Sequence, residues 1–282
     1  MNSTPKEYLK GLRDLPSLPG VALQALAVAE DPSSTASDLL RVIMSDPPLA
    51  AKVLRVANSV HFHRGHVVTD LQTAIVRLGF SNVRNLLMGV AVIRAFNSSF
   101  IGAPYTREDF WVHSIAVGVT ASRLSGESVQ LCASSSFVMG LLHDIGQLVL
   151  DHASREAYGQ ALRSARDSRI PLDEAERRHL DFDHPQIGAE LLASWRFPHE
   201  LVEPVRWHHD PARCDSIHRP HALLLQAADW ICDEHRLGNS GNDYPAKPPA
   251  ETFRTLRLTD ESIASVVEKV REEPLLSLLL PV

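Results

Sequence analysis

Apolar residues recur at intervals of three and four along most of this 282-residue chain, and sustained alternation of apolar and polar residues is almost absent. Intervals of three and four place apolar side chains on one face of an α-helix, whereas alternation is typical of half-buried strands. The spacing therefore predicts an all-α fold. The predicted helical ranges are 47–58, 69–78, 81–90, 110–124, 133–150, 155–168, 185–195, 198–208 (bent at Pro204), 221–235 and 260–270.

Two stretches rich in turn-forming residues divide the chain. Residues 97–106, NSSFIGAPYT, have no apolar helical face, and residues 238–253, GNSGNDYPAKPPAETF, are typical of a loop. We therefore expect an amino-terminal helical lobe over residues 1–100 and a helical core over 101–236. Residues 237–282 are expected to form a linker and a helix that packs on the core.

Composition is that of a folded protein, with 44% hydrophobic and 22% charged residues. Cys132, Cys214 and Cys232 contain no CxxC pair, so neither a disulfide framework nor a cysteine zinc site is expected. The amino terminus lacks an apolar signal segment, and the longest apolar run ends at Arg94, so we expect a cytoplasmic protein that does not enter a membrane. A net charge of −6 makes nucleic acid an unfavourable partner.

The segment GLLHDIGQLVL, residues 140–150, places His143 and Asp144 in an otherwise apolar helix. Burying an unsatisfied ionisable pair costs several kcal/mol, so the two side chains are expected to be hydrogen-bonded or bound to a metal. Adjacent residues point about 100° apart on a helix, so a shared ion needs ligands from other helices. Side chains of suitable type on other apolar helices are His113, His184, His208, His209 and Asp229.

Each of these residues also has a purely structural interpretation. His184 precedes Pro185 and could cap a helix, while Asp229 could pair with Arg206 or be replaced as a ligand by Asp210 or Asp233. The complete set is more informative, since it offers only imidazole and carboxylate, which suit Fe, Mn, Zn or Ni. The mixed charges between residues 155 and 178, including Asp173, Glu174 and Glu176, are typical of a solvated face and are assigned no ligand.

The motifs resemble those of the HD superfamily of metal-dependent phosphohydrolases. That family's H…HD…D order corresponds here to His113, the pair His143 and Asp144, and Asp229. His184, His208 and His209 resemble the further ligands of the HD-GYP phosphodiesterases, a likeness that implies a bridging, catalytic role for Asp144.

The amino-terminal stretches extend the resemblance to the HDOD family of bacterial signalling proteins. They are LPSLPGVALQALAVAEDP, LLRVIMSDPPLAAKVLRVANSVHF and LQTAIVRLGFSNVRNLLMGVAV. The likeness implies a multi-helix HD bundle with an added amino-terminal helical lobe. It also implies a regulatory protein that acts on a protein partner in a signalling pathway.

Two departures from the enzyme pattern bear on catalysis. Gln147 stands where HD-GYP enzymes have a lysine, and no GYP segment follows the histidine doublet, so cyclic di-GMP hydrolysis is disfavoured. The alternative to a regulatory protein is a phosphohydrolase acting on a phosphoester through a mono- or dinuclear centre. In that alternative, His113, His143 and Asp229 hold one ion and His184, His208 and His209 the other.

A third hypothesis is DNA binding by residues 73–89, TAIVRLGFSNVRNLLMG, which resemble a helix-turn-helix. Most of the apolar residues there are needed for packing. Only Arg77, Arg84 and Asn85 are left as outward contacts in an acidic protein, so this hypothesis is disfavoured.

Overall fold

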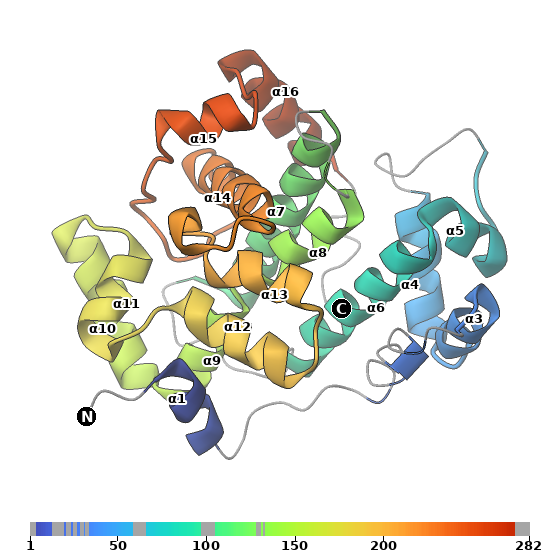
Figure 1. The fold of residues 1–282 in the computed structure, drawn as a ribbon, viewed down its shortest axis with the longest axis horizontal. Coiled ribbons are helices and arrows are strands. Elements are labelled where there is room, and N and C mark those ends of the chain that lie inside the picture. Colours follow the sequence, from blue (N-terminus) through green and yellow to red (C-terminus); the bar gives the residue numbers. More distant parts are fainter. Residues whose placement is uncertain are drawn as a thin grey trace. The chain divides into compact units, whose positions relative to one another are not determined.

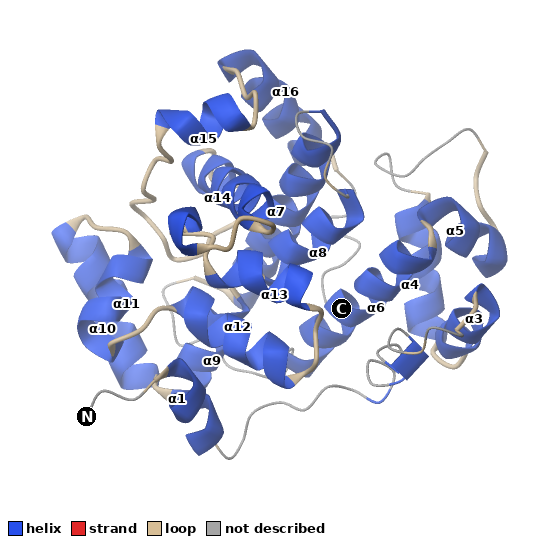
Figure 2. Ribbon diagram, in the orientation of Figure 1, coloured by secondary structure: helices blue, strands red, loops and turns tan. Residues whose placement is uncertain are grey.

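The computed structural model describes residues 4–12, 34–58, 66–96, 105–127 and 133–273, with isolated positions 20, 24, 27, 28, 31 and 131. All regular structure in these residues is helical (Figure 2), which confirms the all-α prediction. Within the same residues, no helix combines the length and apolar character needed to span a bilayer. The chain divides into a larger unit, residues 1–15 and 99–271, and a smaller unit, residues 16–98 and 272–282.

The smaller unit contains four described helices around a core that includes Leu39, Ile43, Val53 and Leu87. Asp46 caps one of them by accepting a hydrogen bond from the Leu49 amide at 2.9 Å, and prolines follow it in the first turn. The helices are α3 (Ala36–Met44), α4 (Pro47–Ala57), α5 (Leu71–Leu78) and α6 (Phe80–Phe96).

Three sets of polar contacts join the helices and connecting segments of the smaller unit. Asp46 also forms an ion pair with Arg94 on α6. Asn58, at the end of α4, donates to the Val68 carbonyl at 2.8 Å and accepts from the Val68 amide at 2.7 Å. Arg77 on α5 donates to the carbonyls of Ala57 and His66, so its guanidinium binds main chain of this unit.

The larger unit is a bundle in which α7 packs against α8, α14 and α16, while α12 packs against α9 and α13 (Figure 1). Its helices are α1 (Pro5–Gly11), α7 (Arg107–Glu127), α8 (Ala133–Leu142), α9 (Ile145–Ala153), α10 (Arg155–Ser168), α11 (Leu172–Leu180), α12 (His184–Ser194), α13 (His199–Arg206), the 3-10 turn η1 (Pro211–Arg213), α14 (Arg219–Glu234), α15 (Ala250–Thr255) and α16 (Asp260–Arg271).

The first fifteen residues group with the larger unit, and the predicted boundary after residue 100 lies beside the division between Ser98 and Ser99. Helix α1 packs on α12. The Tyr8 ring lies 4.9 Å from that of Phe182, and its hydroxyl is 2.5 Å from the Ser154 hydroxyl. These contacts explain why the amino terminus follows the larger unit.

Glycines allow two pairs of helices to approach closely. A Cβ on Gly140 of α8 would lie 2.6 Å from the Cα of Gly118 on α7. A Cβ on Gly146 of α9 would lie 2.0 Å from the carbonyl oxygen of His184 at the start of α12. The glycine of the HDIG segment therefore lets α9 lie directly against the residue that supplies a candidate ligand.

Two sequence-based expectations about local structure were wrong. The predicted continuous helix over 133–150 is broken at His143 and Asp144, which form a turn between α8 and α9. The stretch predicted as a loop over 238–253 contains the start of α15. The predicted final helix beginning at Asp260 is confirmed as α16.

Candidate metal centre

The structure brings all seven predicted ligands together in the larger unit. Six are buried and His209 is partly exposed. They are His113 on α7, His143 and Asp144 in the turn between α8 and α9, His184 at the start of α12, His208 and His209 after α13, and Asp229 on α14.

Asp144 lies among the imidazoles of His143, His184 and His208. Its Oδ1 is 3.2 Å from Nε2 of His143, 3.0 Å from Nε2 of His184 and 3.8 Å from Nε2 of His208. Within the described residues, neither this oxygen nor Nε2 of His208 has a hydrogen-bond partner, although both are fully buried. Buried ligand atoms without partners are costly unless an ion or another group satisfies them.

Asp229 lies close to the imidazoles of His113 and His143. Its Oδ1 lies 3.1 Å from Nε2 of His113 and 3.2 Å from Nε2 of His143. The alternative partner, Arg206, instead pairs with Glu190 at 2.9 Å, so the expected pairing of Asp229 with Arg206 was wrong.

Three of the imidazoles are held so that Nε2 faces the carboxylates. Nδ1 of His143 donates to the Gly140 carbonyl at 2.7 Å, and Nδ1 of His208 donates to the Val205 carbonyl at 2.8 Å. Because carbonyls only accept, the neutral forms of these two rings carry their proton on Nδ1 and a lone pair on Nε2. Nδ1 of His184 lies 2.6 Å from Oε2 of Glu176. This is the arrangement of histidines that bind metals through Nε2.

One histidine of the doublet, His209, lies close to the imidazole of His184. Nε2 of His209 lies 3.2 Å from Nε2 of His184, whose Nδ1 is already engaged by Glu176. The ligand atoms of His184, His208 and His209 all lie within 4.8 Å of one another, and so do those of His113, His143 and Asp144. The centre therefore offers two neighbouring groups of nitrogen and oxygen ligands, with Asp144 between them.

Burial and charge act in opposite directions on these groups. Burial opposes a charge on His143, but the nearby carboxylates of Asp144 and Asp229 raise its pKa to about 10. Burial lowers the pKa of His208 well below its ordinary value, and the neighbouring His209 and His143 lower it further. Without metal, protons on some imidazoles balance the carboxylates, and a divalent cation can take their place. The residues present therefore fit a metal of the Fe, Mn, Zn or Ni type.

Of the alternative carboxylates, Asp233 forms a further candidate ligand group with His113 and Asp229, and Asp210 belongs to none of the ligand groups found among the described residues. Asp233 is one turn after Asp229 on α14, with Oδ1 3.5 Å from Nδ1 of His113. Burial and the charge of Asp229 raise the pKa of Asp233 to about 8. It adjoins the outer nitrogen of His113, while Asp229 faces Nε2.

Glu176 is part of the centre and was not found from the sequence, while Gln147 was noted there only as a departure from the lysine of HD-GYP enzymes. Glu176 is fully buried, so its assignment to a solvated face was wrong, and Oε2 also accepts from the His184 amide at 2.8 Å. Gln147 donates through Nε2 to Oδ2 of Asp144 at 2.8 Å. Asp173 is also buried, which corrects its assignment to the same face.

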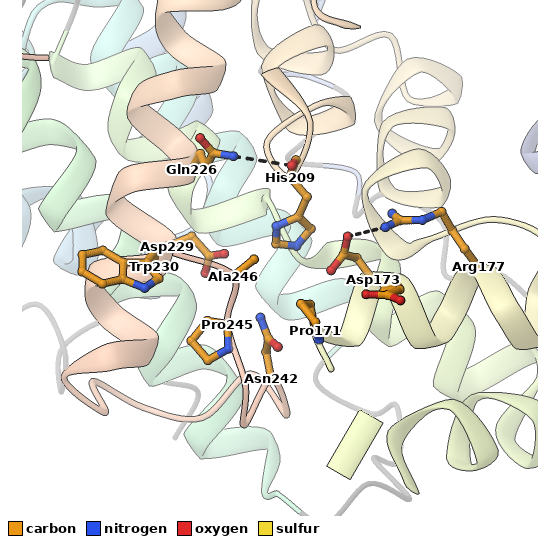
Figure 3. A pocket seen from close by; sticks show the side chains of 11 residues that line it. Pro171, Asp173, Arg177, His209, Gln226, Asp229, Trp230, Asn242, Pro245 and Ala246 are labelled. Carbon is orange, nitrogen blue, oxygen red and sulfur yellow. Dashed lines mark hydrogen bonds and ion pairs between the residues drawn. The ribbon is translucent and has the colours of Figure 1, made fainter. Parts of the chain in front are cut away.

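A pocket of about 180 Å³ forms the mouth of the centre (Figure 3). His209 and Asp229 line it, so it reaches the ligands themselves. Its single arginine, Arg177, is held by Asp173 at 2.8 Å and by Asp183 at 2.6 Å. Burial opposes the charge on Asp173, but His209 and Arg177 lower its pKa.

Residues 237–249 belong to the segment between α14 and α15 and contact the main chain of His113. Gly238 has a φ of +82°, and a Cβ there would lie 2.2 Å from the His113 amide nitrogen. Further along, the amide of Asn239 donates to the Asp109 carbonyl at 3.1 Å, and the Ser240 hydroxyl donates to Oδ1 of Asp233 at 2.9 Å. The segment is therefore joined to the helices that carry His113 and Asp229.

The model of the HDOD domain family matches residues 15–211 of the chain. The chain belongs to the HDOD family. Six of the seven candidate ligands of this HDOD protein lie within the match, and Asp229 lies beyond its end.

Solved structures of proteins from other bacteria have a similar fold. An HDOD domain protein of unknown function from Geobacter sulfurreducens is 21% identical, with a TM-score of 0.80 over 99% of this chain and 97% of that one. A candidate signal transduction protein from Marinobacter aquaeolei is 25% identical, with a TM-score of 0.72 over 99% of this chain and 60% of that one. A candidate phosphohydrolase from Shewanella amazonensis is 23% identical, with a TM-score of 0.72 over 96% of each chain.

Among curated proteins, an uncharacterized protein of Treponema pallidum is 26% identical over 208 residues. The match covers 73% of this HDOD chain but only 40% of the length of that relative.

Proposed function

We propose that this HDOD chain is a cytoplasmic bacterial signalling protein that binds divalent metal in its HD-type centre and acts through contacts with a protein partner. The arrangement around Asp144 supports metal binding most directly, because buried Nε2 atoms converge on an oxygen without a hydrogen-bond partner. The description of the Marinobacter aquaeolei relative as a candidate signal transduction protein supports the signalling role.

Each ligand has a proposed place. His113, His143 and Asp229 would hold one ion, His184, His208 and His209 would hold a second, and Asp144 lies near both sets of ligands. A bound cation of this kind supplies Lewis acidity and lowers the pKa of a coordinated water. The protein contributes fixed imidazole orientations through Gly140, Val205 and Glu176.

The mouth of the centre favours retention of cations over capture of a phosphoester. Asp173, Glu174 and Asp229 line it, and among the described residues that line it the only lysine or arginine is Arg177, which two carboxylates already engage. Phosphate recognition ordinarily uses arginine or lysine side chains that are available to the anion. The neutral Gln147 at the centre adds no positive charge.

A metal-dependent phosphohydrolase is the second candidate function. The complete set of nitrogen and oxygen ligands favours it, since such a set can activate a water for attack on phosphorus. In this alternative Asp144 contacts the reacting centre. The Shewanella amazonensis relative is described as a candidate phosphohydrolase, and cyclic di-GMP stays a disfavoured substrate.

Elemental analysis of protein purified from metal-replete cells tests the metal. We expect one to two equivalents of Fe, Mn, Zn or Ni in the wild type and loss of metal in His143→Ala and Asp144→Ala. His179→Ala, an exposed histidine on α11, is the matched control and should retain the wild-type metal content. A wild-type protein without metal would overturn the proposed metal centre.

Cross-linking in the source bacterium, followed by mass spectrometry, tests the signalling role. We expect the tagged wild type to recover one specific protein partner that Asp144→Ala recovers less well. Failure to recover any partner, combined with hydrolysis of bis-p-nitrophenyl phosphate that Asp144→Ala abolishes, would replace signalling by the phosphohydrolase alternative.

A further inference from the structure

Gln147 occupies a buried position between Asp144 and two tyrosines. Its side chain is 1% exposed. Nε2 donates to Oδ2 of Asp144 at 2.8 Å, and Oε1 accepts from the hydroxyls of Tyr105 at 2.9 Å and Tyr158 at 3.0 Å. The amide of Gln147 therefore connects the carboxylate of Asp144 to the hydroxyls of two buried tyrosines.

The carboxylate of Asp144 fixes which end of the Gln147 amide faces it. Burial raises the pKa of both phenols above the ordinary value, so each hydroxyl keeps its proton and can donate. The carboxylate of Asp144 only accepts, so the NH₂ group of Gln147 faces it and the amide oxygen faces the two hydroxyl donors. Rotation of the amide by 180° would place its oxygen against the carboxylate and lose the hydrogen bond to Asp144.

The tyrosines are themselves held firmly. Tyr158 is fully buried and Tyr105 is 5% exposed, and their hydroxyls lie 3.2 Å apart. Gly241, in the segment between α14 and α15, lies so close that a Cβ would be 2.5 Å from the Tyr105 ring. Burial and close packing therefore restrict the movement of the two rings that hold Gln147.

We propose that Gln147 is a positioning residue that engages Oδ2 of Asp144 and thereby fixes the orientation in which the carboxylate meets the imidazoles. In this orientation Oδ1 lies near His143, His184 and His208 and has no hydrogen-bond partner within the described residues. Oδ2 lies on the side of His113, 4.0 Å from its Nε2. This inference rests on the proposed metal binding. It also gives the glutamine a role of its own, since an amide supplies the hydrogen bond without adding a charge.

Substitutions at Gln147 separate the two halves of the amide. Gln147→Met keeps the approximate length and volume but removes both the donor and the acceptor. Gln147→Glu keeps the acceptor for the tyrosines but replaces the donor by an oxygen that faces Asp144. Gln160→Glu makes the same chemical change at an exposed position on α10 and is the matched control.

The test measures Mn²⁺ binding to the full chain by equilibrium dialysis and the electron paramagnetic resonance spectrum of the Mn²⁺-loaded protein. We expect Gln147→Met and Gln147→Glu to bind Mn²⁺ about 10- to 100-fold more weakly, as loss of a partner to a ligand generally does. We also expect their spectra to differ from the wild type, since the carboxylate of Asp144 is no longer held in one orientation. Circular dichroism of the metal-free proteins checks that each variant folds.

The outcomes distinguish this inference from the proposed function. A wild type that binds Mn²⁺ and a folded Gln147→Met with the same affinity and spectrum would overturn the positioning role alone. A wild type that binds no Mn²⁺ would overturn the metal centre and the positioning role together. Weaker binding and an altered spectrum in both variants, with Gln160→Glu unchanged, would support the inference.

Discussion

Glu176 shows how one buried carboxylate organises a candidate ligand. It accepts from both the main-chain amide and the Nδ1 of His184, and it has no exposed surface. Burial raises the pKa of Glu176, and the facing His184 opposes that rise. The side chain therefore directs Nε2 of His184 toward Asp144.

The substitution Glu176→Gln tests this role. The neutral amide keeps a hydrogen bond of similar shape but loses the charge that favours a proton on Nδ1, so we expect metal affinity to fall about 10- to 100-fold. Competition with a chelator of known affinity measures the change. Glu156→Gln, at an exposed position on α10, should bind metal as the wild type does. Equal affinities in the two variants would contradict the role.

Asp46 is the corresponding single residue in the smaller unit, because it caps α4 and pairs with Arg94 of α6. The Arg94 hydrogen bond lowers the pKa of this carboxyl against the opposing effect of burial. A folded-state pKa below the unfolded value of about 3.9 gives stability that is present above that value and is lost as the pH falls through the lowered pKa.

Asp46→Asn should therefore lower stability near neutral pH but matter less in acid, since asparagine keeps the cap and loses only the charge. Urea unfolding of both proteins at pH 6 and pH 3, followed by circular dichroism, measures the difference between them. We expect that difference to shrink at pH 3. A difference that stays constant or grows would contradict an ionised Asp46 as its source.

At this scale, residue types and the apolar character of their helices were enough to find the seven candidate ligands. Chemistry limits such a centre to few residue types, and histidine and aspartate are conspicuous among leucines and valines. Glu176 could not be found in the same way, because LDEAERRHL has the charge pattern of an exposed helix. Its burial depends on how α11 meets α12, which is a tertiary fact.

The turn between α8 and α9 is the element on which the centre depends. His143 and Asp144 lie in a turn, so a continuous helix does not set the directions of their side chains. After this turn, α9 packs on α12, and Gly146 is the point of close contact. The apolar pattern continues across the turn without proline, so the sequence predicted one helix. The competing requirement is packing, because α8 and α9 contact different helices.

Gly146→Ala tests that close approach. A Cβ would lie 2.0 Å from the His184 carbonyl, so α9 or α12 must shift. Overpacking of this kind costs about 1–3 kcal/mol, and the shift should also reduce bound metal because it moves His184. Gly159→Ala in α10, where a Cβ meets only an arginine nitrogen at 3.5 Å, should instead leave stability equal or raise it by about 0.5–1 kcal/mol. Thermal unfolding and metal analysis of both variants provide the measurement.

At the scale of the whole molecule, the candidate ligands all belong to the larger unit. The sequence indicated an amino-terminal lobe from family likeness and from the turn-rich residues 97–106. It gave no sign that α1 belongs with the larger unit, since the contact of Tyr8 with Phe182 joins residues far apart in the chain.

Metal should consequently stabilise one unit and not the other. Free metal at 100 times its dissociation constant adds about 2.7 kcal/mol to the unit that binds it. In differential scanning calorimetry, a chelator is expected to move the transition of the larger unit to lower temperature and leave that of the smaller unit in place. A single transition that shifts as a whole would show that the units unfold together, and no shift would contradict metal binding.

Residues 237–249 contain no helix, and a segment of that kind is ordinarily where a protease first cuts a folded chain. Here the segment is seated on the main chain of His113 through Gly238 and tied to Asp233 through Ser240. A protease must lift it away from both before cleavage. We therefore expect slow cleavage in this segment when the buried core is intact. A change that disturbs His113 or Asp233 should increase the rate of cleavage.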